Sequence, residues 1–189
     1  MRTGLQKSLS DGSDGLPLGT HVNLLAVLQS VNLWLHLISM AVWVGGMAFF
    51  LFVFGPAAHS LAPADGIRAL NHGRQSFQTL SWIAINLLFL TGALNFLFRA
   101  TASGLHLGTA YYSILAVKLL LFLAMTFHYS LQAFKYAPRI ASLTAQTGGG
   151  IESWPEPLLA AWRKWFTLLK INTTLGAIVL FLGLGLSGR

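Results

Sequence analysis

Four long apolar stretches dominate this 189-residue chain and limit what it can fold into. A helix rises about 1.5 Å per residue, so about 20 apolar residues cross the hydrocarbon core of a bilayer. Such stretches run over residues 31–54, 77–98, 110–134 and 166–186. The sequence therefore predicts an all-α integral membrane protein. We expect a four-helix bundle over residues 31–189, preceded by an N-terminal tail, residues 1–30, with amphipathic character.

Composition supports a membrane environment and excludes several classes of site. Hydrophobic residues make up 54% of the chain and charged residues 9%, whereas a soluble domain carries roughly a quarter charged residues. The chain has no cysteine, which excludes disulfides and thiolate metal sites. The net charge of +7 does not indicate nucleic-acid binding, because the bases lie at the ends of apolar stretches, where they meet lipid headgroups.

The distribution of basic residues predicts an orientation. The connections after the first and third stretches hold Arg68, Arg74, Lys135, Arg139, Arg163 and Lys164. Because cytoplasmic loops carry an excess of Lys and Arg, we expect these connections in the cytoplasm and both termini outside, as in a bacterial inner membrane.

Breakers and tryptophans suggest where the helices end. Gly55-Pro56 should end the first helix, and the third should end before Pro138. We expect an interfacial helix continuous with the second span over residues 57–76, and a loop over residues 140–157. Residues 158–164 resemble an amphipathic lead-in to the fourth span, with interfacial anchors at Trp154, Trp162 and Trp165.

His36 is the first of three ionisable residues deep within the spans, in addition to Lys170 just inside the fourth, and such residues are functional candidates because burying them in a bilayer is unfavourable. One helical stripe carries His36 together with Ser39, Met40, Trp43 and Met47. An imidazole here is either a bundle-facing group hydrogen-bonded to a neighbour or an axial ligand of haem or a metal. In a bilayer we favour the ligand.

Lys118 is the second, and it has no carboxylate to pair with inside the membrane. The five acidic residues, Asp11, Asp14, Asp65, Glu152 and Glu156, all lie outside the spans. The lysine is therefore neutral, bound to backbone carbonyls, extended to the interface, or paired with an anionic ligand such as a haem propionate or a lipid phosphate. Tyr111 lies seven residues earlier on the same face and would share that contact.

His128, the third, lies toward the opposite end of the bundle from His36. His72 precedes the second span on that same side, followed at helical spacing by Ser76, Thr79, Ile83 and Asn86. This polar stripe is expected to face the bundle interior, which would bring His72 towards His128. An ordinary interfacial histidine is the alternative at His72.

Glycines recur within the spans, at positions 45, 46, 92, 176 and 183. They indicate either close helix packing, which is common in membranes, or room for a flat macrocycle between helices.

Several short motifs resemble the copper-resistance D (CopD) family and the related HemJ-type protoporphyrinogen oxidases. The run from His36 to Gly46, with Trp43, is similar to the first-helix motif of both. Thr91-Gly92 and the segment from Tyr112 to Lys118 are similar to CopD motifs, and His128 is similar to a HemJ-type histidine. The resemblance implies a four-helix membrane protein associated with haem or copper.

The chain also departs from both patterns. Asn172 stands where CopD proteins often carry a Glu, which argues against ion transport by that family's route. The segment after Gly46 lacks the Pro-Arg pattern of HemJ-type enzymes, which argues against porphyrinogen oxidation.

The leading hypothesis is a b-type haem protein of the membrane that transfers electrons to a quinone or cytochrome. His36 would ligate one haem near Lys118 and Tyr111, with His106, His21 or Met40 as second ligand; His72 and His128 would hold a second. The alternatives are a copper permease using His36, Met40 and Met47, and an accessory subunit of a larger respiratory or photosynthetic complex. The sequence leaves catalytic activity and homo-oligomer formation open, and no nucleophile–base pair lies in the spans.

Overall fold

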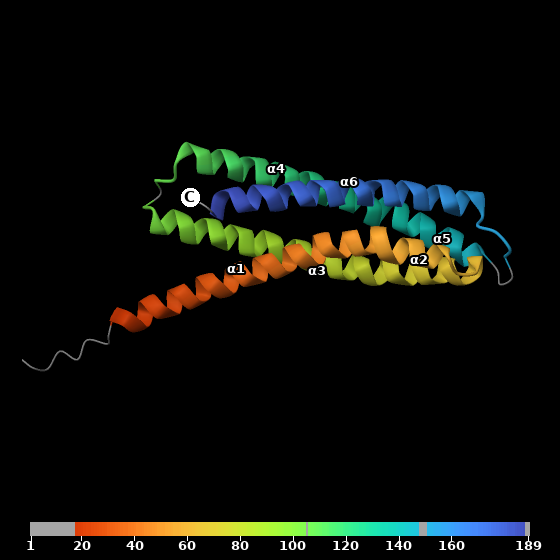
Figure 1. Cartoon of the computed structure of the whole chain (residues 1–189), viewed down its shortest axis with the longest axis horizontal. Helices are drawn as coiled ribbons and strands as arrows, with labels where there is room; N and C mark the ends of the chain where they lie inside the picture. The colour runs from red at the N-terminus through yellow and green to blue at the C-terminus, as the bar shows by residue number, and fades with distance from the viewer. Residues whose placement is uncertain (1–17, 105, 148–150, 188–189) are drawn as a thin grey trace, which may run out of the picture.

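The computed structural model describes residues 18–104, 106–147 and 151–187. Helices account for nearly all of this part of the chain (Figure 1). Their bounds are α1 Leu18–Phe49, η1 Phe50–Phe54, α2 Gly55–His59, α3 Pro63–Ala102, α4 Thr109–Leu131, η2 Gln132–Tyr136, α5 Ala137–Gln146 and α6 Glu156–Ser187, where η marks a π-helical turn.

Four helical segments are long and apolar enough to cross a membrane, so the all-α four-helix membrane fold is confirmed. They run over Leu24–His59, Pro63–Ala102, Thr109–Gln146 and Glu156–Gly183. Each exceeds the roughly 20 residues that a bilayer core requires. The helices are therefore longer than an upright crossing requires, and the expected interfacial helix before the second span is part of the 40-residue α3.

Neither Pro56 nor Pro138 ends its helix, which corrects the expectation from the sequence. A five-residue π-helical turn precedes each proline, at η1 and η2, and the proline then occupies the second residue of α2 or α5. Proline disrupts a helix because it lacks an N–H and its ring meets the carbonyl one turn back. The wider π turn changes which carbonyl lies there, and the first helical positions need no N–H donor. The region expected as a loop from residue 140 is thus helical as far as Gln146.

The helices pack as two pairs. α1 lies along α3, α4 lies along α6, and α6 also contacts α1, whereas α3 and α4 meet through long side chains such as Tyr129 (Figure 1). The start of α1, the α3–α4 connection and the end of α6 lie at one end of the bundle, which we call the terminal end. The α2–α3 turn and the α5–α6 connection lie at the other, the loop end.

An aromatic core fills the half of the bundle nearer the loop end. Phe50 stacks within 5.1 Å of Trp165 and 5.7 Å of Phe77, measured between ring centroids. Trp162 and Trp165 are 1% and 2% exposed. The prediction that these two tryptophans anchor the protein at the lipid interface is therefore wrong, because the face of α6 that carries them packs against η1.

Candidate functional site

His36 and Thr91 join α1 to α3 through one short hydrogen bond. The distance from His36 Nδ1 to Thr91 Oγ1 is 2.7 Å. The single hydroxyl hydrogen of Thr91 is already directed to the Leu87 carbonyl, at 2.6 Å. Thr91 Oγ1 therefore accepts from a protonated Nδ1, which leaves the lone pair of His36 on Nε2. A neutral imidazole in this tautomer is ready to ligate a metal through Nε2.

Asn32 closes the site one turn nearer the terminal end. Its side-chain amide donates to the Thr91 carbonyl at 3.0 Å and to Asn95 Oδ1 at 2.8 Å. Asn32 is 8% exposed and Thr91 is 1% exposed. These two bonds join α1 to α3 between residues that are 59 and 63 positions apart in sequence. They therefore hold the α1–α3 register that places His36 against Thr91.

The other two helices bring a cation to the same level. Lys118, half-buried on α4, lies close enough to His36 for its ammonium charge to act on the imidazole. A Cβ atom added at Gly183 of α6 would lie 3.8 Å from Lys118 Nζ, and one added at Gly92 of α3 would lie 3.5 Å from His36 Cε1. His36, Gly92, Lys118 and Gly183 thus converge from four different helices.

No carboxylate neutralises Lys118 in the part of the chain that the structure describes. The ion pairs found there are Arg68 with Asp65 and Arg163 with Glu156, and all four side chains are well exposed. The cation that contacts Tyr111 in the structure is Arg99, whose guanidinium lies 5.0 Å from the centre of the Tyr111 ring. The positive charge beside His36 favours an anionic group as a neighbour and opposes a bare cation.

Three buried thioethers lie further along the interior. Met40 and Met47 of α1 are 9% and 0% exposed, as the stripe through His36 predicted. Met125 of α4, 1% exposed, belongs to the same core, and sequence reasoning did not select it because a methionine in an apolar helix looks like ordinary packing. Trp43 lies between Met40 and Met47 on α1 and is 1% exposed.

Gly46 serves helix packing in this structure. A Cβ atom added there would lie 3.0 Å from the Phe77 ring of α3. Gly176 plays the same part between α6 and α1, since a Cβ atom there would lie 2.8 Å from Val44. Of the two interpretations left open for the glycines, close packing therefore holds at Gly46 and Gly176.

His72 is turned away from the bundle interior. It is exposed, and so are Ser76, Thr79, Ile83 and Asn86. The expectation that this stripe faces inward is wrong, because the polar side chains at 79 and 86 satisfy themselves on carbonyls of their own helix. The opposite face of α3 packs against α1, and it carries Arg74, Phe77 and Ser81.

The remaining histidines do not gather around His36. His128 is half-buried, and its Nδ1 atom has no hydrogen-bond partner. His106 lies in the α3–α4 connection and bonds to the Gly104 carbonyl at 2.8 Å. The side chain of His21 lies outside the described residues. Within the described ranges no three His, Cys, Asp or Glu side chains form a metal-binding group.

Arg74 is a buried cation that sequence reasoning placed in a basic connection. It is 4% exposed, and its guanidinium donates to Asn71 Oδ1 at 2.7 Å and to Gln78 Oε1 at 3.2 Å. Nearby, the Tyr129 hydroxyl donates to the Gln78 carbonyl at 3.0 Å. The spacing of Asn71 and Gln78, three before and four after Arg74, is the signal that places all three on one helical face.

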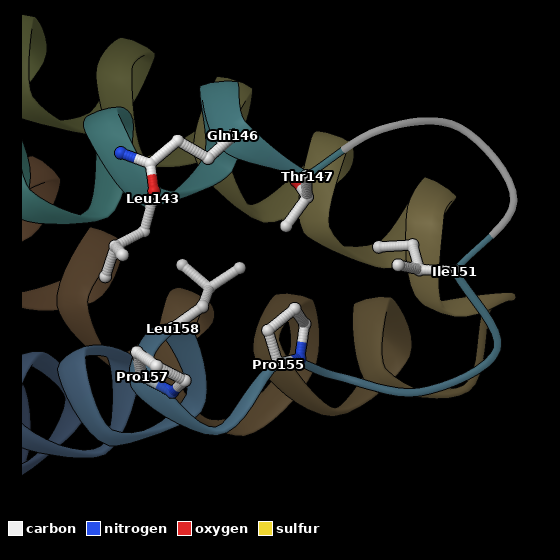
Figure 2. A pocket seen from close by; sticks show the side chains of 7 residues that line it. All are labelled: Leu143, Gln146, Thr147, Ile151, Pro155, Pro157 and Leu158. Atoms are coloured by element: carbon white, nitrogen blue, oxygen red, sulfur yellow. The ribbon is translucent and has the colours of Figure 1, made fainter.

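A pocket of about 300 Å³ lies at the loop end, far along the chain from these groups. Figure 2 shows Leu143 and Leu158 pointing toward each other across it. Its lining is Leu143, Gln146, Thr147, Ile151, Pro155, Pro157 and Leu158. None of these side chains carries a charge or ligates metals well, so the pocket does not add to the His36 site.

Comparison with known proteins identifies one family. Residues 73–186, more than half of the chain, match the family described as Copper resistance protein D. The matched region includes Thr91, Gly92 and Lys118, and His36 lies before it. No curated protein and no solved structure matches the chain.

Proposed function

The chain belongs to the copper resistance protein D family, and from that membership we propose that it binds copper within the membrane, with His36 as the ligand that receives the ion. The observation that carries the proposal is the tautomer imposed on His36. Thr91 Oγ1 accepts a hydrogen bond from the protonated Nδ1, which leaves the lone pair of the ring on Nε2. Imidazole suits copper, and an orienting hydrogen bond on the other ring nitrogen is the usual companion of a metal-ligating histidine.

The thioethers define the oxidation state that the interior prefers. Soft sulfur ligands select Cu(I) over harder ions. Met40 lies about one turn from His36 and Met47 about three turns, both toward the loop end, while Met125 approaches from α4. Cu(I) received at His36 would therefore meet soft, uncharged ligands on its way into the bundle. Neutral ligands also suit an interior that holds no acidic side chain among the described residues.

A haem site is the second candidate, and Lys118 is the observation that favours it. Its uncompensated charge beside His36 would pair with a haem propionate. His36 would then be the residue that holds the haem iron, and the haem would supply one-electron transfer. A single haem fits better than two, because His72 faces away from the bundle.

One pair of measurements on the detergent-purified protein separates the two candidates. The first is an anaerobic Cu(I) titration against a coloured Cu(I) chelator, and the second is a reduced-minus-oxidised visible spectrum after expression with haem supplied. The copper proposal predicts stoichiometric Cu(I) capture and a visible spectrum without haem bands. Sharp b-type bands without Cu(I) capture would replace copper by haem. The absence of both would reject the His36 site as a ligand-binding centre.

Replacing Lys118 by leucine should act in opposite directions on the two ligands, and leucine adds no sulfur that could itself bind Cu(I). The ammonium charge acts on His36, and repulsion between like charges near a protein surface is on the order of 1–2 kcal/mol. Removing the ammonium should therefore raise Cu(I) affinity by about tenfold, whereas haem would be held less tightly without its propionate partner. Lys135→Leu, at an exposed lysine of the loop end, serves as the control. Weaker Cu(I) binding in Lys118→Leu would count against the copper assignment.

Replacing Thr91 by valine should weaken metal binding without removing a ligand. Valine keeps the shape of threonine but cannot accept a hydrogen bond from His36 Nδ1–H, so the imidazole loses the bond that orients it. Loss of such a partner typically lowers metal affinity by about 10- to 100-fold. Thr101→Val removes a hydroxyl that bonds only to carbonyls of its own helix, Leu97 and Phe98, and should leave the affinity unchanged. Equal effects of the two substitutions would show that Thr91 does not act through His36.

We propose that the loop end faces the cytoplasm. The exposed bases of that end are Arg68, Lys135, Arg139, Arg163 and Lys164, and such residues are retained on the cytoplasmic side. The chain has no cysteine, so single cysteines introduced at Ser142 and Ser103 report the orientation directly. An impermeant thiol reagent added to intact cells should label the cysteine at position 103 and leave the cysteine at position 142 unlabelled.

A further inference from the structure

We propose that the groove between η1 and α6 binds an anionic phospholipid of the leaflet at the loop end. The groove has a volume of about 420 Å³ and is lined by Leu51, Phe52, Lys170, Thr173 and Thr174. It lies on the outer surface of the bundle, away from His36, and the proposal does not depend on copper or haem.

The walls of the groove combine one charge with an apolar side. Phe52 is 69% exposed and, with Leu51, forms a wall suited to an acyl chain. Thr173 and Thr174 direct their hydroxyl hydrogens to carbonyls of α6, Leu169 at 2.8 Å and Lys170 at 3.1 Å. The ammonium of Lys170 is therefore the charged donor that the groove offers, and a phosphate oxygen complements it.

Lys170 lies just inside the apolar part of α6, within side-chain reach of the lipid headgroups. The apolar stretch of α6 begins at residue 166, so Lys170 lies about 6 Å inside it by helical rise. Arg163 and Thr167, seven and three residues earlier, continue the same exposed face toward the headgroups. Neither ion pair of the described residues involves Lys170. A lysine can also extend to water from this depth, but an extended lysine needs no groove beside it.

The charge on Lys170 decides the class of lipid. A basic residue near an anionic surface contributes attraction, and each one adds to lipid selectivity. With Arg163 already paired to Glu156 at 3.9 Å, Lys170 is the base that remains beside the groove. The occupant is therefore an anionic phospholipid, whose phosphate pairs with Lys170 while one acyl chain lies along Phe52.

Native mass spectrometry of the whole protein released from vesicles of equal phosphatidylglycerol and phosphatidylcholine tests the proposal. The wild type should retain phosphatidylglycerol preferentially. Lys170→Gln should lower that preference roughly fivefold, while Lys164→Gln, at an exposed lysine outside the groove lining, should leave it unchanged. Thr174→Trp keeps Lys170 but fills the groove, and should also reduce retention.

Any of three results would overturn the lipid site. The first is a wild-type protein that retains both lipids equally. The second is an equal loss of preference in Lys164→Gln and Lys170→Gln, which would show a diffuse basic surface and no defined site. The third is a Thr174→Trp protein that keeps the full preference, which would show that the lipid does not lie in the groove.

Discussion

Replacing His36 by alanine should reduce Cu(I) affinity by at least about a hundredfold, more than the loss of an orienting partner produces. Alanine removes the imidazole that bonds to Thr91 and is acted on by the charge of Lys118. The fold should survive, because Thr91 keeps its bond to the Leu87 carbonyl and Asn32 still joins α1 to α3. Loss of one such hydrogen bond lowers stability by about 1 kcal/mol.

The measurement is an anaerobic chelator competition on wild type, His36→Ala and His106→Ala. His106 is exposed in the α3–α4 connection and bonds only locally, to Gly104, so its replacement should leave Cu(I) affinity as it was. If the purified protein instead carries haem, the same His36 variant should lose the b-type bands. Binding that persists in His36→Ala would remove His36 from the site for either ligand.

Replacing Trp43 by alanine should destabilise the bundle by about 3–5 kcal/mol, as for other large buried aromatic residues. Trp43 is 1% exposed and packs edge-to-face on Phe122 and Tyr129, with ring centroids 6.1 and 6.3 Å away. Its indole Nε1 has no hydrogen-bond partner within the described residues. The expected loss therefore comes from packing between α1 and α4, where a cavity would remain.

Thermal unfolding of the detergent-solubilised protein, followed by circular dichroism, measures this loss. Trp34 of the same helix is the matched control, because it is 66% exposed on the lipid-facing side. Trp34→Ala should shift the midpoint by little. Similar shifts for Trp34→Ala and Trp43→Ala would mean that the α1–α4 contact does not stabilise the bundle.

Two failures of sequence reasoning, at the His72 stripe and at the tryptophans of α6, share one physical origin. The stripe from His72 to Asn86 looked like an interior face because it was polar. It is exposed, and the Asn86 side chain bonds to a carbonyl of its own helix. Trp162 and Trp165 looked like interface anchors because tryptophan is common there, yet they fill the core. The spacing of residues along a helix shows which of them share a face. In a membrane protein the lipid-facing and the bundle-facing sides are both largely apolar, so the spacing does not indicate which face packs inside the bundle.

The candidate site divides in the same way. His36, Met40 and Met47 were identifiable from the sequence, because ionisable and sulfur-bearing residues stand out on an apolar helix. Met125 and Arg74 were not, because their importance lies in neighbours that come from elsewhere in the fold or in a burial that a basic side chain does not predict. Thr91 was selected through a family resemblance alone, and its bond to His36 supplies the physical reason.

The sequence by itself determined that this chain is a four-helix membrane protein, because bilayer thickness converts directly into a length of apolar residues. It also determined that the spans contain basic side chains and no acidic ones, since every carboxylate lies outside the spans. Only the tertiary structure decided that His36 meets Thr91, Gly92 and Lys118, and that helices continue through Pro56 and Pro138. Those outcomes depend on the rotation and register of each helix against its neighbours, which are set by side-chain packing and by a few hydrogen bonds between residues far apart in the chain.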